Sequence, residues 1–190
     1  ILQGTIPIEE LIGAVKADGM PCVSLTDTNG MYGSIKFAKK AKEENLKAIL
    51  GVLIDDPKSK ELNALFLAKN NEGYSSLCQI VTSRKLKEDF SLIKLLDEDL
   101  QNLIVITASI DLLRILSNID RLIKNLYVEL ISTKKHKMKT RELYNFARTN
   151  NLQIVASNPT YFLNTEDHLL HKVVAAIKEN TTLENISEDE

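Results

Sequence analysis

The chain has 190 residues, of which 44% are apolar and 26% are charged, and its formal net charge is -2. This composition is that of an ordinary globular protein, long enough to bury one substantial core. A charge this close to zero excludes attraction of the whole chain to nucleic acid or to an anionic membrane, so any such binding depends on a local patch.

Short β-rich apolar runs alternate with segments of helical period along the chain, which favours parallel βα units over an antiparallel meander. Strands are predicted over 22–26, 48–54, 64–68, 103–107, 126–131 and 153–157. Helices are predicted over 8–17, 31–45, 73–86, 111–124, 140–150 and 165–178. A parallel sheet or barrel needs a strand before the first helix. We therefore expect a first strand to be missing before Ile1.

One domain is expected over residues 1–182, and the acidic residues 183–190 are interpreted as a tail or as a linker to a longer chain. No apolar run approaches the roughly 20 residues that span a bilayer, which predicts a cytoplasmic protein with no membrane partner. Cys22 and Cys78 belong to no cluster with zinc-binding spacing, so both are predicted to be reduced thiols in the core.

The segment from Leu25 to Gly33 (Leu-Thr-Asp-Thr-Asn-Gly-Met-Tyr-Gly) follows a predicted strand and leads into a predicted helix. The carboxyl ends of strands in α/β proteins are where polar site residues gather. Asp27 and Asn29 could be remnants of a metal site. The favoured interpretation is that they cap the next helix and shape the turn.

This segment resembles the Asp-His-Gly-Asn-Met-Tyr-Gly signature of the PHP (polymerase and histidinol phosphatase) domain family, as it occurs in the alpha subunit of bacterial DNA polymerase III. Segments that match the family in the same order are Gly19-Met20-Pro21, Ile49-Leu50-Gly51, residues 67–74 (Leu-Ala-Lys-Asn-Asn-Glu-Gly-Tyr) and Ala156-Ser157-Asn158. The resemblance implies an α/β fold, a distorted (βα)7 barrel, which agrees with six predicted strands and one missing.

The resemblance also implies where a metal site would lie. In the family, His and carboxylate ligands hold two or three divalent ions, which generate a hydroxide and neutralise charge on a phosphate ester. By position, those ligands fall on Gln3, Thr28, Leu53, Pro159 and Tyr161. The side chains of Leu53 and Pro159 have no lone pair to donate to a metal. The site is therefore expected to be degenerate, with no catalytic residue and no cofactor; its vestigial positions are Gln3, Asp27, Thr28, Asn29, Leu53, Glu129, Asn158, Pro159 and Tyr161.

Glu129 and the pair of His168 and His171 have two interpretations each. Glu129 alternates with apolar neighbours on a predicted strand, and either points into the mouth of a barrel or, as favoured, is a satisfied buried or a solvent-facing carboxylate. His168 and His171 are three residues apart, a spacing that can place two imidazoles on one metal. No third ligand of suitable spacing accompanies them, which favours a structural role.

The strongest basic run follows a predicted strand and consists of Lys134, Lys135, Lys137, Lys139 and Arg141. Such a run can contact the phosphates of DNA or a partner protein. A solvated loop that leads into a helix is the favoured interpretation.

The resemblance implies a scaffold or interaction domain within a replicative polymerase alpha subunit, whose partners are the remainder of that subunit, a proofreading exonuclease and DNA. One alternative is an active metal-dependent 3′-5′ exonuclease or phosphoesterase, which would hold zinc or manganese on unusual ligands such as Asp27, Glu129 and His171. The other is a free-standing interaction module with no polymerase attached.

Overall fold

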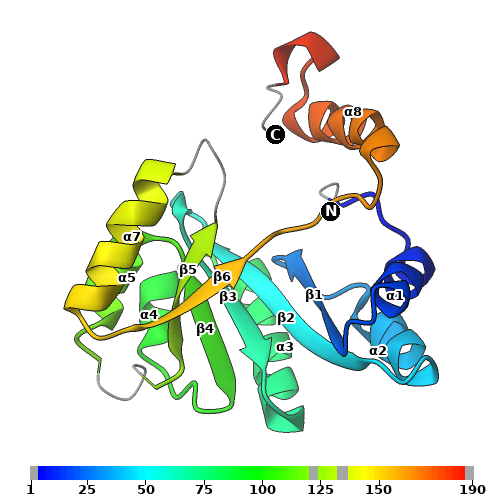
Figure 1. Ribbon diagram of the computed structural model, residues 1–190. Coiled ribbons are helices and arrows are strands. Elements are labelled where there is room, and N and C mark those ends of the chain that lie inside the picture. The colour runs from blue at the N-terminus through cyan, green and yellow to red at the C-terminus, as the bar shows by residue number, and fades with distance from the viewer. Residues whose placement is uncertain (1–3, 120–123, 132–136, 187–190) are drawn as a thin grey trace. The chain divides into compact units, whose positions relative to one another are not determined.

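The computed structural model describes residues 4–119, 124–131 and 137–186 (Figure 1). These residues form the strands β1 (Cys22–Thr28), β2 (Lys47–Asp56), β3 (Ser59–Ala68), β4 (Leu103–Thr107), β5 (Leu126–Ile131) and β6 (Gln153–Ser157). The α-helices are α1 (Ile8–Ala17), α2 (Ser34–Glu43), α3 (Asn71–Leu86), α4 (Leu92–Leu96), α5 (Ile110–Leu116), α7 (Lys137–Thr149) and α8 (His168–Glu179). Two short 3-10 helices are η1 (Thr165–Asp167) and η2 (Leu183–Asn185). The predicted strands are thus all confirmed, and the missing first strand stays a prediction.

The six strands form one mixed sheet in the order β1-β2-β3-β4-β5-β6. The backbone N–H of Lys47 donates to the carbonyl of Pro21, and that of Asn29 donates to the carbonyl of Leu53. Because these bonds follow the same order along both strands, β1 and β2 run parallel. The pairs β4·β5 and β5·β6 are also parallel.

The prediction of parallel units is wrong for β2, β3 and β4, which pair antiparallel. Pro57 and Lys58 alone separate β2 from β3, and a parallel neighbour would need a crossover of about a dozen residues or more. The only connection this short that the chain can make is a hairpin. Its register shifts between Asp55 and Asp56, where the paired residue of β3 changes from Asn63 to Ser59, so the pairing is irregular at the end of β2.

The chain divides into two compact units. Unit 1 consists of residues 1–23, 36–48 and 158–190, and unit 2 consists of residues 24–35 and 49–157. The single domain over residues 1–182 stays a prediction.

The core of unit 2 lies between one face of the sheet and the helices α3, α4, α5 and α7 (Figure 1). A row of paired residues crosses this face, in which Val52 is opposite Phe66, Phe66 opposite Val105, and Val105 opposite Leu126. All four side chains are buried. Since side chains alternate along a strand, Leu53 and Asp55 of β2 and Glu129 of β5 lie on the other face.

Several predicted helix boundaries and one burial prediction need correction. The helix predicted over 31–45 begins only at Ser34, and α5 ends at Leu116, where a turn at Ser117 and Asn118 follows. Helix α4 was not predicted, because five residues are too few to show a helical period. Cys78 is not a core thiol, since it lies on the exposed side of α3.

In unit 1, ion pairs join α1 to α2 and to the turn that follows α2. Lys16 lies 2.8 Å from Glu44, and Lys36 lies 2.7 Å from Glu9. Lys40 also contacts Glu44, at 3.2 Å. These groups are all at the surface, so each pair adds little to stability.

We expect the pKa of Glu44 to lie below its usual range, first because Lys16 donates a hydrogen bond to its carboxylate and then because Lys40 does so. The carboxylate is favoured in the folded state. Its contribution is therefore present above the ordinary pKa of Glu and is lost as the pH falls through the lowered pKa. A carboxyl NMR titration measures this pKa, which should rise in Lys16→Met. A midpoint unchanged by that substitution would contradict the assignment.

A search of the described residues finds no helix that combines the length and the apolar character needed to span a membrane.

Candidate functional site

The Asp27–Gly33 motif lies where β1 ends, at the carboxyl edge of a parallel strand pair. Asn29 follows the strand directly and adopts the left-handed conformation, with a φ of 51°. Its backbone N–H donates to the carbonyl of Leu53 at 2.8 Å. The chain therefore bends at Asn29, and a turn follows at Tyr32 and Gly33. Asp27 and Asn29 do not cap the next helix, because α2 begins only at Ser34.

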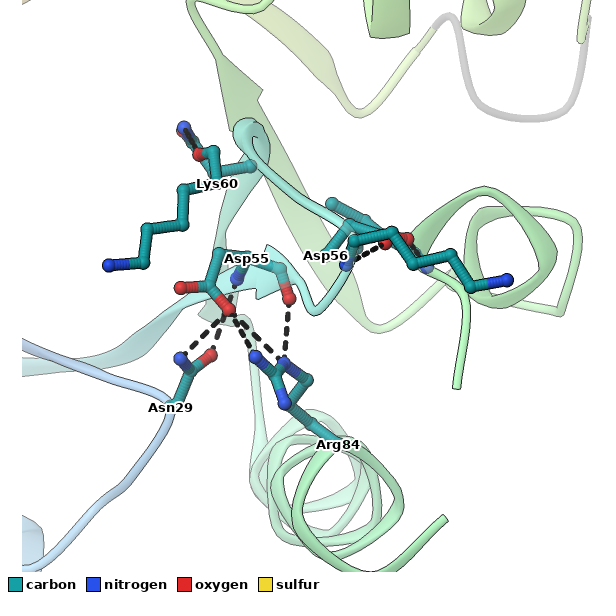
Figure 2. A network of polar contacts seen from close by, with 8 residues as sticks. Asn29, Asp55, Asp56, Lys60 and Arg84 are labelled. Atoms are coloured by element: carbon teal, nitrogen blue, oxygen red, sulfur yellow. Dashed lines mark hydrogen bonds and ion pairs between the residues drawn. The ribbon is translucent and has the colours of Figure 1, made fainter. Parts of the chain in front are cut away.

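The side chain of Asn29 joins a polar network with Asp55 and Arg84 (Figure 2). The Asn29 Nδ2 donates to Asp55 Oδ1 at 3.0 Å, and the Asp55 backbone N–H donates back to Asn29 Oδ1 at 3.3 Å. From α3, Arg84 Nη2 donates to the same Asp55 Oδ1 at 2.6 Å, and its Nε donates to the Asp55 carbonyl at 2.7 Å. One carboxylate thus ties the loop after β1 to α3.

Burial strengthens this network. The side chain of Asp55 is only 17% exposed and that of Arg84 only 20%. Hydrogen bonds between ionised groups are shorter and roughly twice as strong as neutral ones, and the pair is screened by solvent less than a pair at the surface. The carboxylate of Asp55 is therefore engaged by the protein's own cation.

The next residue, Asp56, is also fully engaged by the protein. It is buried, and its Oδ1 and Oδ2 accept the backbone N–H groups of Lys58 and Leu92, both at 2.9 Å. The first bond shapes the turn of the hairpin, and the second reaches the start of α4. Both carboxylates at the end of β2 thus serve to hold elements together.

A second contact fixes the far side of the loop. The Nζ of Lys85 lies 4.7 Å from the centre of the Tyr32 ring and donates a hydrogen bond to its hydroxyl group. Tyr32 is 71% exposed, so the loop is held from α3 and not by burial of this ring.

The remaining vestigial positions fall in different parts of the chain. Thr28 is the last residue of β1, and Leu53 is an apolar residue within β2. The carboxylate of Glu129 accepts a hydrogen bond of 2.5 Å from the hydroxyl of Ser157 on the neighbouring strand β6, which satisfies one of its oxygens. Exposed residues of unit 1 include Asn158, Pro159 and Tyr161, while Gln3 lies outside the described residues.

The two histidines of α8 contact aromatic rings. His171 is buried, and its ring stacks on Tyr161 with centroids 5.3 Å apart. Phe162 lies 5.6 Å from the ring of His171 and 5.8 Å from that of His168. The His171 ring therefore contributes to packing, whereas His168 is exposed and meets Phe162 edge-on.

The described residues do not fit a metal cage of the kind that the PHP resemblance implies. No group of three His, Cys, Asp or Glu side chains among them is arranged so that it could hold a metal ion. Leu53 offers no lone pair, and Asp55, the carboxylate two residues further on the same face, is bound by Arg84. We therefore derive no chemical step through a metal.

The described part of the basic run lies at the start of α7. Lys137, Lys139 and Arg141 are exposed there, while Lys134 and Lys135 lie outside the described residues. Contact of this segment with DNA or with a partner stays a prediction.

Sequence reasoning missed Asp55 and Arg84, which carry the network. The residues of this network are far apart in the sequence. Asp55 is 26 residues from Asn29, and Arg84 is 29 residues from Asp55. No periodic pattern links such distant residues. The available signal was weak: two adjacent aspartates at the end of a strand and a basic pair, Arg84-Lys85, at the end of a helix.

Comparison with known proteins places these features in context. A family model described as "PHP domain" matches residues 1–161. The chain is 30% identical to the DNA polymerase III subunit alpha of Buchnera aphidicola, over 96% of this chain and 18% of that protein. It is 27% identical to the subunit of the same name from Borreliella burgdorferi, over 93% of this chain and 18% of that protein. The chain thus spans about a fifth of the length of these curated relatives.

Among solved structures, the chain is similar to a protein from Bifidobacterium adolescentis that is described as a "putative metal-dependent phosphoesterase". The TM-score is 0.50 at 11% sequence identity, and the match covers 82% of each chain. A likeness at this level shows the fold alone.

Proposed function

The chain belongs to the PHP domain family, and from this premise we propose that it is the PHP domain of a DNA polymerase III alpha subunit and serves there as a scaffold without phosphoesterase activity. Nucleotide addition in DNA replication would then be carried out by other parts of such a subunit, as a DNA-directed DNA polymerase of the cytoplasm. This domain would support the polymerase core and offer a surface to a proofreading exonuclease or to DNA.

The observation that carries this proposal is which side chains lie near the end of β2 and what they contact. Leu53 occupies the position of a family ligand, and Asp55, on the same face of the strand, is neutralised by Arg84 at 2.6 Å. A divalent ion at this carboxylate would lie beside the guanidinium of Arg84, and the repulsion between the two cations opposes its binding.

The rival function is an active metal-dependent 3′-5′ exonuclease or phosphoesterase with zinc or manganese on unusual ligands. It requires ions that the protein holds through purification. The two functions therefore differ in metal content, which can be measured without knowing the substrate.

We expect the protein, purified at its full natural length without chelator, to contain zinc and manganese near background in elemental analysis. A matched control is a PHP protein with the complete His and carboxylate ligand set, prepared in the same way, which should retain its ions. One or more ions per chain in the test protein would overturn the scaffold function and would call for exonuclease assays with the loaded protein.

A further inference from the structure

We infer that Arg84 is an internal cation that positions the motif loop, residues 29–33, by acting through the carboxylate of Asp55 on the side chain of Asn29. This inference deepens the proposed function, because it identifies what holds the end of β1 where the family's ligands are replaced. Arg84 is a positioning residue in this role.

One oxygen of the Asp55 carboxylate accepts hydrogen bonds from several donors. Asp55 Oδ1 accepts from Arg84 Nη2 at 2.6 Å, from Arg84 Nε at 3.1 Å and from Asn29 Nδ2 at 3.0 Å. A shared carboxylate oxygen couples its donors. If Arg84 moves, the negative charge of Asp55 is less neutralised, which changes the hydrogen bond from Asn29 Nδ2 to Asp55 Oδ1. Arg84 also donates to the Asp55 carbonyl, which fixes the backbone from which Asp55 projects.

Asn29 has a left-handed backbone conformation. Its φ of 51° is uncommon for a residue other than glycine, although Asn tolerates it better than most residues do. The side chain of Asn29 makes hydrogen bonds in both directions with Asp55. These bonds compensate the backbone conformation, so the loop depends on Asp55 keeping its position.

Two consecutive cations lie at the end of α3. Arg84 and Lys85 lie in the last turn of α3, where positive charge is favourable to the helix dipole. Arg84 reaches the beginning of the loop through Asp55, and Lys85 contacts Tyr32 near the loop's end. The end of α3 therefore holds the loop on both sides.

A double-mutant cycle on the chain tests the inference, with the unfolding equilibrium constant measured in urea. Arg84→Met should raise this constant on the order of 30-fold, because it leaves the half-buried Asp55 carboxylate without its cation. Adding Asp55→Asn to Arg84→Met should recover part of that loss. Single effects that simply multiply in the double variant would overturn the coupling between the two residues.

Hydrogen exchange measured by mass spectrometry on a peptide that covers residues 25–35 reports on the loop itself. Arg84→Met should raise exchange there by a larger factor than it raises the unfolding constant, whereas exchange in β4 and β5 should rise by no more than that constant does. An equal rise in exchange over the whole of unit 2 would mean that Arg84 only stabilises the fold, and would overturn the positioning role.

The matched control is Arg114→Met, which removes the same side chain type from the exposed ion pair with Asp111. Both of its side chains are more than half exposed, so the unfolding constant should change about twofold or less. The outcome is separable from that of the metal analysis. Bound metal would refute the scaffold function and leave the coupling intact, whereas additive substitutions would refute the coupling in a protein without metal.

Discussion

Phe66→Ala is expected to lower the free energy of unfolding by about 4 kcal/mol. Phe66 is fully buried at the centre of the row that crosses β2, β3 and β4, opposite Val52 on one side and Val105 on the other. Its removal takes away the buried area of an aromatic ring and leaves a cavity that two flanking strands prevent from closing. Urea unfolding followed by circular dichroism measures the loss.

Two control substitutions show how large the loss for Phe66→Ala should be by comparison. Phe66→Leu keeps most of the volume and should cost about 1.5 kcal/mol or less. Leu86→Ala removes a side chain that is 77% exposed at the end of α3, and should change the free energy of unfolding by about 0.5 kcal/mol or less. Similar losses for Phe66→Ala and Leu86→Ala would contradict the placement of the core.

The strands could be predicted because their signal is local. Leu103–Thr107 consists of apolar and β-branched residues, Gln153–Ser157 has an apolar centre of Ile154, Val155 and Ala156, and both strands have the predicted bounds. Strand direction was less accessible, because it depends on the length of each connection. Only the turn at Pro57 and Lys58 indicates that β2 and β3 form a hairpin. The predicted bounds ended β2 at residue 54 and began β3 at residue 64, and thus concealed how short this turn is.

The candidate site could be located from the sequence but its contacts could not. The Asp27–Gly33 motif correctly indicates a turn at the end of β1, since Asn29 adopts a positive φ. The two side-chain contacts of Asp55 in this network, with Asn29 and with Arg84, join residues that are 26 and 29 positions apart in the sequence. Both are properties of the folded chain and leave no local pattern.

The segments that match the PHP family include residues whose contacts maintain the fold. A Cβ atom at Gly51 would lie 2.7 Å from the carbonyl oxygen of Phe66 and 3.0 Å from Thr26 Cγ2, so a larger residue would push the strands β1 and β3 away. Asn70 caps α3 by accepting the backbone N–H of Gly73 at 2.8 Å. These two matches to the family therefore have structural reasons within this fold.

Gly73→Ala is expected to lower the free energy of unfolding by about 3 kcal/mol, although alanine is the better helix former. A Cβ atom at Gly73 would clash with the carbonyl oxygen of Asn102 and lie 3.2 Å from the Cα atom of Ala68. Both are backbone atoms, so no side chain can rotate to make room. The gain from helix propensity is only about 1 kcal/mol, and the clash outweighs it.

The control for Gly73→Ala is Gly13→Ala in α1, where a new Cβ atom would meet no atom within 4 Å. There the helix propensity acts alone, and the substitution should stabilise the chain by about 0.5–1 kcal/mol. The same change is thus expected to have opposite signs in two helices of one protein. A Gly73→Ala variant as stable as the unmodified chain would mean that α3 can move away from Asn102. The Arg84 contact to Asp55 would then lose its fixed support, because the same helix carries it.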